Sequence, residues 1–165
     1  MGWGPASEYE GGLFFLNFFD VINIPFTSKV MGRILGIDFG KKRTGLSTTD
    51  PLKLIVSGLE TVNTSELDDF IKNYVETEDV EKLVFGKPTH KDGNPTYIWN
   101  DIQRRADLYQ KQFPFLKIDY EDENFTSVDA HQILLQTVSK KKRRDKKIVD
   151  KLSAVLILQK YLGHI

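Results

Sequence analysis

Three short apolar segments follow one another with hardly any chain between them, and this spacing restricts how the chain can fold. They are RILGID (33–38), RTGLSTT (43–49) and LIVSGLETV (54–62). Each has the length and apolar content of a buried strand, and turn residues such as Gly40 and Asp50-Pro51 separate them. Because parallel strands need a long crossover connection, these three are predicted to form an antiparallel meander.

The rest of the chain alternates strand patterns with helix patterns. Strands are predicted at KLVFG (82–86) and KIDYEDE (117–123), and helices near 67–75, 96–112, 126–137 and 148–162, with Thr64 or Ser65 as the cap of the first. This order predicts an α/β fold with a mixed five-stranded sheet and helices on both of its faces.

The composition excludes several kinds of site. The chain has 165 residues, which suits one domain, and its formal net charge of +0 indicates no class of partner. It contains no cysteine, which excludes disulfides, thiolate metal sites and a cysteine nucleophile. The histidines at 90, 131 and 164 lack metal-ligand spacing, which argues against a histidine-bound zinc ion.

Residues 1–30 differ in character from the rest of the chain. Their apolar stretch at 13–26 is shorter than the ~20 residues that span a bilayer, and no basic residue precedes it. We therefore expect no signal peptide, no membrane anchor and a cytoplasmic protein. Met31 opens the first strand pattern, so residues 1–30 are predicted to be an N-terminal extension of a domain spanning 31–165. The alternative is a segment that binds a partner or a membrane surface, because exposed Phe pairs are costly.

The string GIDFGKKRTG (36–45) places an acid at the end of a buried strand, where it is costly unless it is paired or binds a metal. Lys41, Lys42 and Arg43 add cations directly beside Asp38. An acid for a metal and bases for phosphate are the combination that phosphodiester chemistry needs. The alternatives are that Asp38 caps the turn, or that the string cradles a phosphate as in actin-like ATPases.

A second acidic string, IDYEDENFTS (118–127), ends the last strand. Alternation along a strand places Asp119, Glu121 and Glu123 on one face, where they repel one another unless a cation compensates. The alternation does not choose between Glu121 and Glu123. Position favours Glu123, because sites in open α/β sheets lie beyond the carboxyl ends of the strands. The alternative is an acidic, solvated strand end.

The final helix pattern carries Asp150 near its start, followed by the small residues Ser153 and Ala154, which would pack against the sheet. A favourable interaction with the helix dipole is the structural alternative for Asp150. A basic run precedes it and is interpreted as a phosphate-backbone contact, although a solvated loop has the same pattern. The run consists of Lys140, Lys141, Lys142, Arg143, Arg144, Lys146 and Lys147.

Taken in order, the motifs resemble the YqgF family, whose members are described as pre-16S rRNA nucleases and as Holliday junction resolvases. The stretches that carry the resemblance are GIDFGKKRTGLSTTDP, LVFGKPTHKDGNPT, DENFTS and KKIVDKLSAVLILQKYL. The resemblance implies a ribonuclease-H-like fold in which Asp38, Glu123 and Asp150 are the catalytic acids and the ligands of Mg²⁺ or Mn²⁺. Asn124 stands where the family usually has Arg, so one cation is missing, although the amide can still donate to a phosphate oxygen.

The function expected from this resemblance is metal-dependent hydrolysis of phosphodiester bonds, with two ions bridged by Asp38, in 5′-end maturation of pre-16S rRNA. Lys41, Lys42, Arg43 and Asn124 would contact the nucleic acid together with the basic run. A Holliday junction resolvase acting on four-way DNA as a homodimer, a catalytically idle RNA-binding module and an actin-like phosphotransferase are the alternatives. The sequence leaves monomer and homodimer open.

Overall fold

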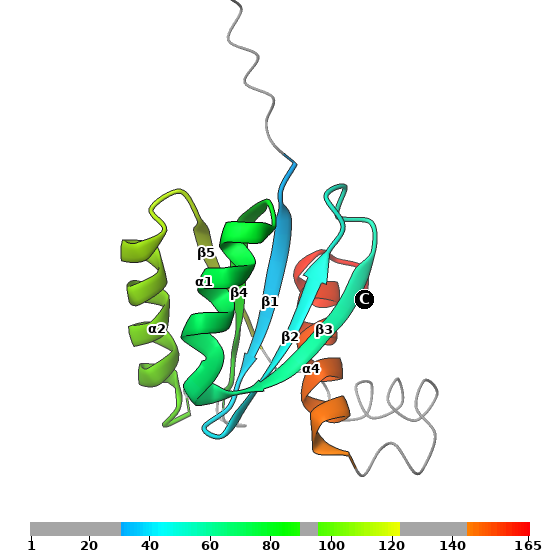
Figure 1. The fold of residues 1–165 in the computed structure, drawn as a ribbon. Helices are drawn as coiled ribbons and strands as arrows, with labels where there is room; N and C mark the ends of the chain where they lie inside the picture. Colours follow the sequence, from blue (N-terminus) through cyan, green and yellow to red (C-terminus); the bar gives the residue numbers. More distant parts are fainter. Residues whose placement is uncertain (1–30, 90–95, 123–144) are drawn as a thin grey trace, which may run out of the picture.

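The computed structural model describes residues 31–89, 96–122 and 145–165 (Figure 1). Five strands form one sheet in the order β3-β2-β1-β4-β5. They are β1 (Arg33–Phe39), β2 (Arg43–Thr49), β3 (Val56–Asn63), β4 (Val80–Lys87) and β5 (Lys117–Asp122). The first three pair antiparallel, whereas β4 pairs parallel with both β1 and β5. The predicted meander and the mixed five-stranded sheet are confirmed.

Helices cover both faces of this sheet, as predicted. They are the 3-10 turn η2 (Thr64–Glu66), α1 (Leu67–Thr77), α2 (Trp99–Gln112) and α4 (Lys146–Tyr161). In Figure 1, α1 and α2 lie on one face and α4 on the other. None of the helices in the described ranges has the length and apolarity needed to cross a membrane.

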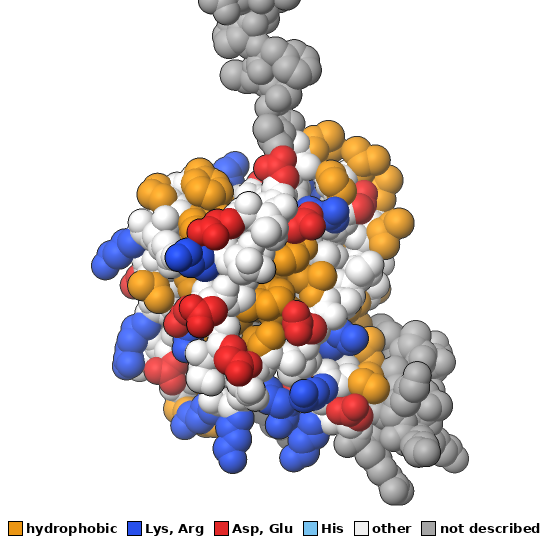
Figure 2. Space-filling model, viewed as in Figure 1, with side chains coloured by type: hydrophobic (Ala, Val, Ile, Leu, Met, Phe, Trp, Pro, Cys, Tyr) orange, Lys and Arg blue, Asp and Glu red, His pale blue; other side chains and the backbone are white. Residues whose placement is uncertain are grey.

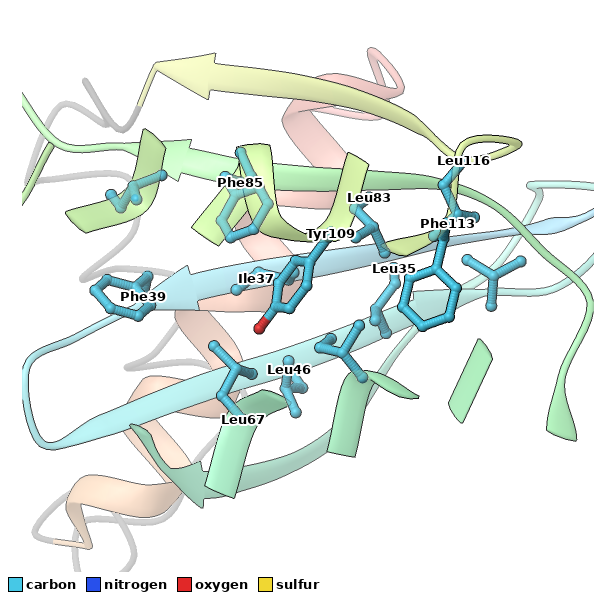
Figure 3. Close-up of a cluster of buried hydrophobic side chains, with 14 of the residues drawn as sticks. Leu35, Ile37, Phe39, Leu46, Leu67, Leu83, Phe85, Tyr109, Phe113 and Leu116 are labelled. Carbon is cyan, nitrogen blue, oxygen red and sulfur yellow. The ribbon is translucent and has the colours of Figure 1, made fainter. Parts of the chain in front are cut away.

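Alternation along β1 divides its side chains between the two faces. Leu35, Ile37 and Phe39 point into the larger core, where α1 and α2 supply Ile71 and the fully buried Tyr109 (Figure 3). The residues between them face α4, whose buried side chains form a second, smaller core with β1 and β4. Asp38 therefore lies on the α4 side of the sheet.

Helix α4 packs unusually close to the sheet because the sheet residues that face it are small. A Cβ built on Gly45 would lie 2.0 Å from the backbone oxygen of Asp150, so only glycine fits there. Ser47 donates a hydrogen bond to the backbone oxygen of Ala154 at 2.7 Å, and Ala154 is fully buried. The expectation that small residues of the last helix pack against the sheet is confirmed.

Several local predictions were wrong, and the helix expected from residue 96 begins at Trp99. Thr64 does not cap α1, because its hydroxyl donates to the backbone oxygen of Gly40 at 2.6 Å and a 3-10 turn precedes the helix. The third strand begins at Val56, since the preceding turn folds back onto Asp50. Helix α4 begins at Lys146, two residues earlier than predicted, because the side chain of Asp145 accepts from the backbone N–H of Lys147.

Candidate active site

Two carboxylates meet at the carboxyl end of β1. Asp38 is the penultimate residue of β1 and pairs in register with Gly45 of β2. Gly45 in turn lies against the backbone of Asp150 in α4. The tight contact between α4 and β2 thus brings the second acid beside the first, although they are far apart in the sequence.

The environment of Asp38 disfavours its charged form. The pKa of this carboxyl is raised from 3.8 to about 7, first by burial and then by the neighbouring charge of Asp150, while a hydrogen bond from the Ser153 side chain acts in the opposite direction. The negative charge of Asp38 is therefore costly beside the second carboxylate. The site therefore favours a cation.

The second acid is held by a cation of the neighbouring turn. Arg43 Nε donates to Asp150 Oδ2 at 2.8 Å, and both side chains are about one-third exposed or less, at 32% and 26%. Asp150 lies beyond the first turn of α4, which contains no acidic residue. The helix-dipole interpretation of Asp150 is thereby weakened, since that interaction fades beyond the first turn.

Thr64, on the face of the sheet opposite Asp38, holds the turn between β1 and β2 through hydrogen bonds. The Thr64 backbone N–H donates to the backbone oxygen of Lys42 at 3.1 Å, and its hydroxyl bonds Gly40 and Thr44. These bonds hold the turn on which Lys41, Lys42 and Arg43 stand. Both lysines are exposed and Arg43 is partly buried.

The acids at positions 119 and 121 of β5 have partners of their own. Asp119 accepts from Lys82 Nζ at 2.7 Å and from the Tyr161 hydroxyl at 2.5 Å, and these bonds lower its pKa. Glu121 forms an ion pair with Lys160 at 3.1 Å. The prediction that Asp119 and Glu121 share one face is confirmed, and lysines of β4 and α4 compensate their negative charges. Because Glu121 is already paired with Lys160, Glu123 is the better candidate of the two for the catalytic acid.

Some predicted site residues lie outside the described residues, so their placement stays a prediction. These are Glu123, Asn124, Lys140, Lys141, Lys142, Arg143 and Arg144, together with the helix expected at 126–137. Lys146 and Lys147 are described and belong to the first turn of α4. The prediction that these two lysines precede the helix was wrong, because the helix begins at the Asp145 cap.

Sequence reasoning missed the roles of two hydroxyl groups. Ser153 was singled out only for its small size, yet it is a hydrogen-bond partner of Asp38. Its position three residues after Asp150 places both on one side of α4, which was the available signal. Thr64 was treated as a cap, and no sequence pattern indicated that it would bond the turn after Asp38.

The fold resembles that of a solved Holliday junction resolvase. The Holliday junction resolvase of fowlpox virus aligns with a TM-score of 0.51 at 10% sequence identity, over 81% of this chain and 99% of that one. The likeness, together with a mixed sheet that carries an acid at the end of its first strand, defines a ribonuclease-H-like α/β protein.

The sequence comparisons give the family. A family model described as "RuvX: Holliday junction resolvase" matches residues 32–164, and the chain belongs to this family. Membership makes it a nuclease, a hydrolase acting on phosphodiester bonds, and confirms the resemblance to YqgF.

Curated relatives match over the same region. A protein of Porphyromonas gingivalis named "Putative pre-16S rRNA nuclease" is 48% identical over 135 residues, which are 81% of this chain and 98% of that protein. Proteins of the same name from Bacteroides fragilis and Christiangramia forsetii are 43% and 44% identical, each over 80% of this chain and 96% and 98% of their own.

Proposed function

We propose that this protein is a cytoplasmic, divalent-cation-dependent nuclease that trims the 5′ end of pre-16S rRNA, with residues 31–165 as the nuclease domain and residues 1–30 as an extension. The observation that carries the proposal is the pair Asp38 and Asp150 at the end of β1, in which burial raises the pKa of Asp38 to about 7. The names of the curated relatives support the choice of RNA substrate.

The donor set suits a hard cation. Asp38 and Asp150 present carboxylate oxygens, which Mg²⁺ and Mn²⁺ prefer, and the desolvated Asp38 has a charge that a cation would compensate. Asp38, Asp150 and the predicted Glu123 would hold the ion. Within the described residues, no group of three or more acids or histidines is close enough to hold a metal by itself, which is consistent with a third ligand at Glu123. When bound, such a cation supplies the positive charge that activates water and stabilises the leaving oxygen.

The remaining residues would orient the acids and bind the substrate. The Ser153 hydroxyl holds the Asp38 carboxylate, and Arg43 Nε holds Asp150. A guanidinium has five N–H donors, so Arg43 can contact a phosphate oxygen through its terminal amino groups while it keeps this bond. Lys41 and Lys42 stand exposed on the same turn, where they can bind phosphates of the nucleic acid.

The test is cleavage of a 5′-extended 16S rRNA precursor by the full chain in Mg²⁺ or Mn²⁺, with EDTA as the metal-free arm. Wild-type protein should cleave only with the cation, and Asp38→Asn should not cleave although it binds the RNA. Asp107→Asn, which removes an exposed carboxylate on α2, is the matched control and should retain activity. Wild-type RNA binding without cleavage in either metal would refute the nuclease proposal in favour of an RNA-binding module.

A second candidate function is resolution of four-way DNA junctions, favoured by the description of the family model. Symmetric cleavage of a junction requires two active sites, so the acting species would be a homodimer. Four-way DNA as an additional substrate, with the oligomeric state measured by light scattering, separates the two functions. Efficient junction cleavage by a dimer, with an uncut rRNA precursor, would favour the resolvase.

A further inference from the structure

A hollow of about 590 Å³ opens at the end of the sheet where β1 finishes, on the face opposite Asp38. It lies between the β1–β2 turn, the region of η2 and α1, and the side of α2 that carries Asp101 to Leu108. Phe39 lines the hollow, whereas its neighbour Asp38 faces α4, because successive side chains of a strand point to opposite faces. The hollow and the carboxylate pair therefore lie back to back across a single strand.

The charged side chains on the inner wall of the hollow already pair with one another and stabilise the fold. Arg105 of α2 forms an ion pair with Asp68 of α1 and stands over the Phe39 ring at 5.4 Å. The Tyr109 hydroxyl donates to the same carboxylate at 2.6 Å. This network ties α1 to α2, so neither Arg105 nor Asp68 is available to a ligand without cost to the fold.

The rim, in contrast, carries two accessible cations, Lys41 and Arg104, and an exposed aromatic ring lies beside Lys41. Lys41 Nζ lies 4.2 Å from the ring centroid of Tyr97, and Tyr97 is 72% exposed. The Arg104 side chain is 77% exposed, and its ion pair with Asp101 is long, at 3.5 Å, which is the kind that contributes little to stability. Figure 2 shows Lys and Arg side chains gathered along this edge of the molecule.

Exposed cations beside an exposed ring are the combination that holds a nucleic-acid strand, with phosphates on the cations and a base on the ring. The β1–β2 turn distributes its cations to both sides of the sheet. Arg43 pairs with Asp150 of the carboxylate pair, whereas Lys41 lines the hollow and lies over the Tyr97 ring. One nucleic-acid strand at the acids and the other at the hollow would then pass on opposite sides of this turn.

We propose that the hollow binds the uncleaved strand of a two-stranded nucleic acid, with its phosphates on Lys41 and Arg104 and a base against Tyr97. The proposal rests on the proposed nuclease function and narrows its substrate to one that is paired beside the cut. Asp101, whose charge faces the same phosphates, would weaken the interaction.

The test measures binding in EDTA by fluorescence anisotropy with the full chain. One probe is an RNA hairpin with a single-stranded 5′ extension, and the other is the extension alone. Arg104→Gln should weaken hairpin binding about threefold to tenfold and lower the slope of log affinity against log salt by about 0.9, with no change for the single strand. Asp101→Asn should tighten hairpin binding. Lys111→Gln, which removes an exposed charge from the far end of α2, should change neither.

An equal loss on both probes, no loss on either, or the same loss in Lys111→Gln would overturn the proposal, and so would weaker hairpin binding by Asp101→Asn. Circular dichroism of each variant establishes that the helix is intact. Since binding is measured without a cation and needs no catalysis, a failure here is separate from a failure of the cleavage assay.

Discussion

The Asp38→Asn variant should be more stable than the wild type at alkaline pH, although it should have no activity. In the folded protein the pKa of Asp38 is about 7, whereas 3.8 is its ordinary value and the one expected after unfolding. Between these values the folded state keeps a proton that the unfolded state has lost, so the wild type loses stability as the pH rises from about 4 to about 7. An asparagine carries no charge and avoids this loss.

The size of the effect is set by the difference between the two pKa values. At 1.36 kcal/mol per pKa unit, the difference between 3.8 and about 7 corresponds to ~4 kcal/mol at full ionisation, as an upper bound. Asp38 is partly exposed, so solvent screening reduces the effect, and we expect ~2 kcal/mol above about pH 8. Below about pH 4 the two proteins should be equally stable, because Asp38 is then protonated in both states.

Urea unfolding in EDTA at several pH values, followed by circular dichroism, measures the effect. The wild type should approach the stability of the variant when excess Mg²⁺ is added above pH 7, because a ligand of the folded state stabilises it, whereas the variant should respond little. Asp107→Asn, at an exposed site, should show no comparable pH dependence. If Asp38→Asn were less stable than the wild type at about pH 8, Asp38 would be a structural anchor and the argument for a cation site would be refuted.

Two predictions concern the packing on each face of the sheet. Gly45→Ala should cost at least ~1–3 kcal/mol in urea unfolding and abolish cleavage, because its Cβ would lie 2.0 Å from the Asp150 backbone oxygen and push α4 away. Gly58→Ala on the same face should be milder, since its Cβ would meet Lys151 Cγ at 2.7 Å, a side-chain atom that can shift more readily than the backbone, and equal losses would contradict the close-approach argument. Tyr109→Phe should cost ~1–2 kcal/mol in the same assay, because the fully buried hydroxyl donates to Asp68 at 2.6 Å, and an unchanged midpoint would refute that role.

Much of the fold could be predicted because local patterns are strong in this chain. The short connections at 33–62 forced an antiparallel meander, and alternation along the last strand correctly placed Asp119 and Glu121 on one shared face. One error arose because a side chain bonds a distant partner rather than a local one. Thr64 has the position of a helix cap, but its hydroxyl bonds Gly40 across the turn.

The sequence by itself determined which residues could act: an acid at the end of the first strand, cations beside it, and a second acid on the last helix. Only the tertiary structure decided how they meet. The approach of α4 over Gly45 brings Asp150 to Asp38, and Arg43, expected to bind phosphate, pairs with Asp150. The raised pKa of Asp38 and the hollow behind it likewise come from elements far apart in the chain. The physical reason is that burial and charge proximity depend on distances in space, whereas a sequence pattern reports only the local periodicity of the backbone.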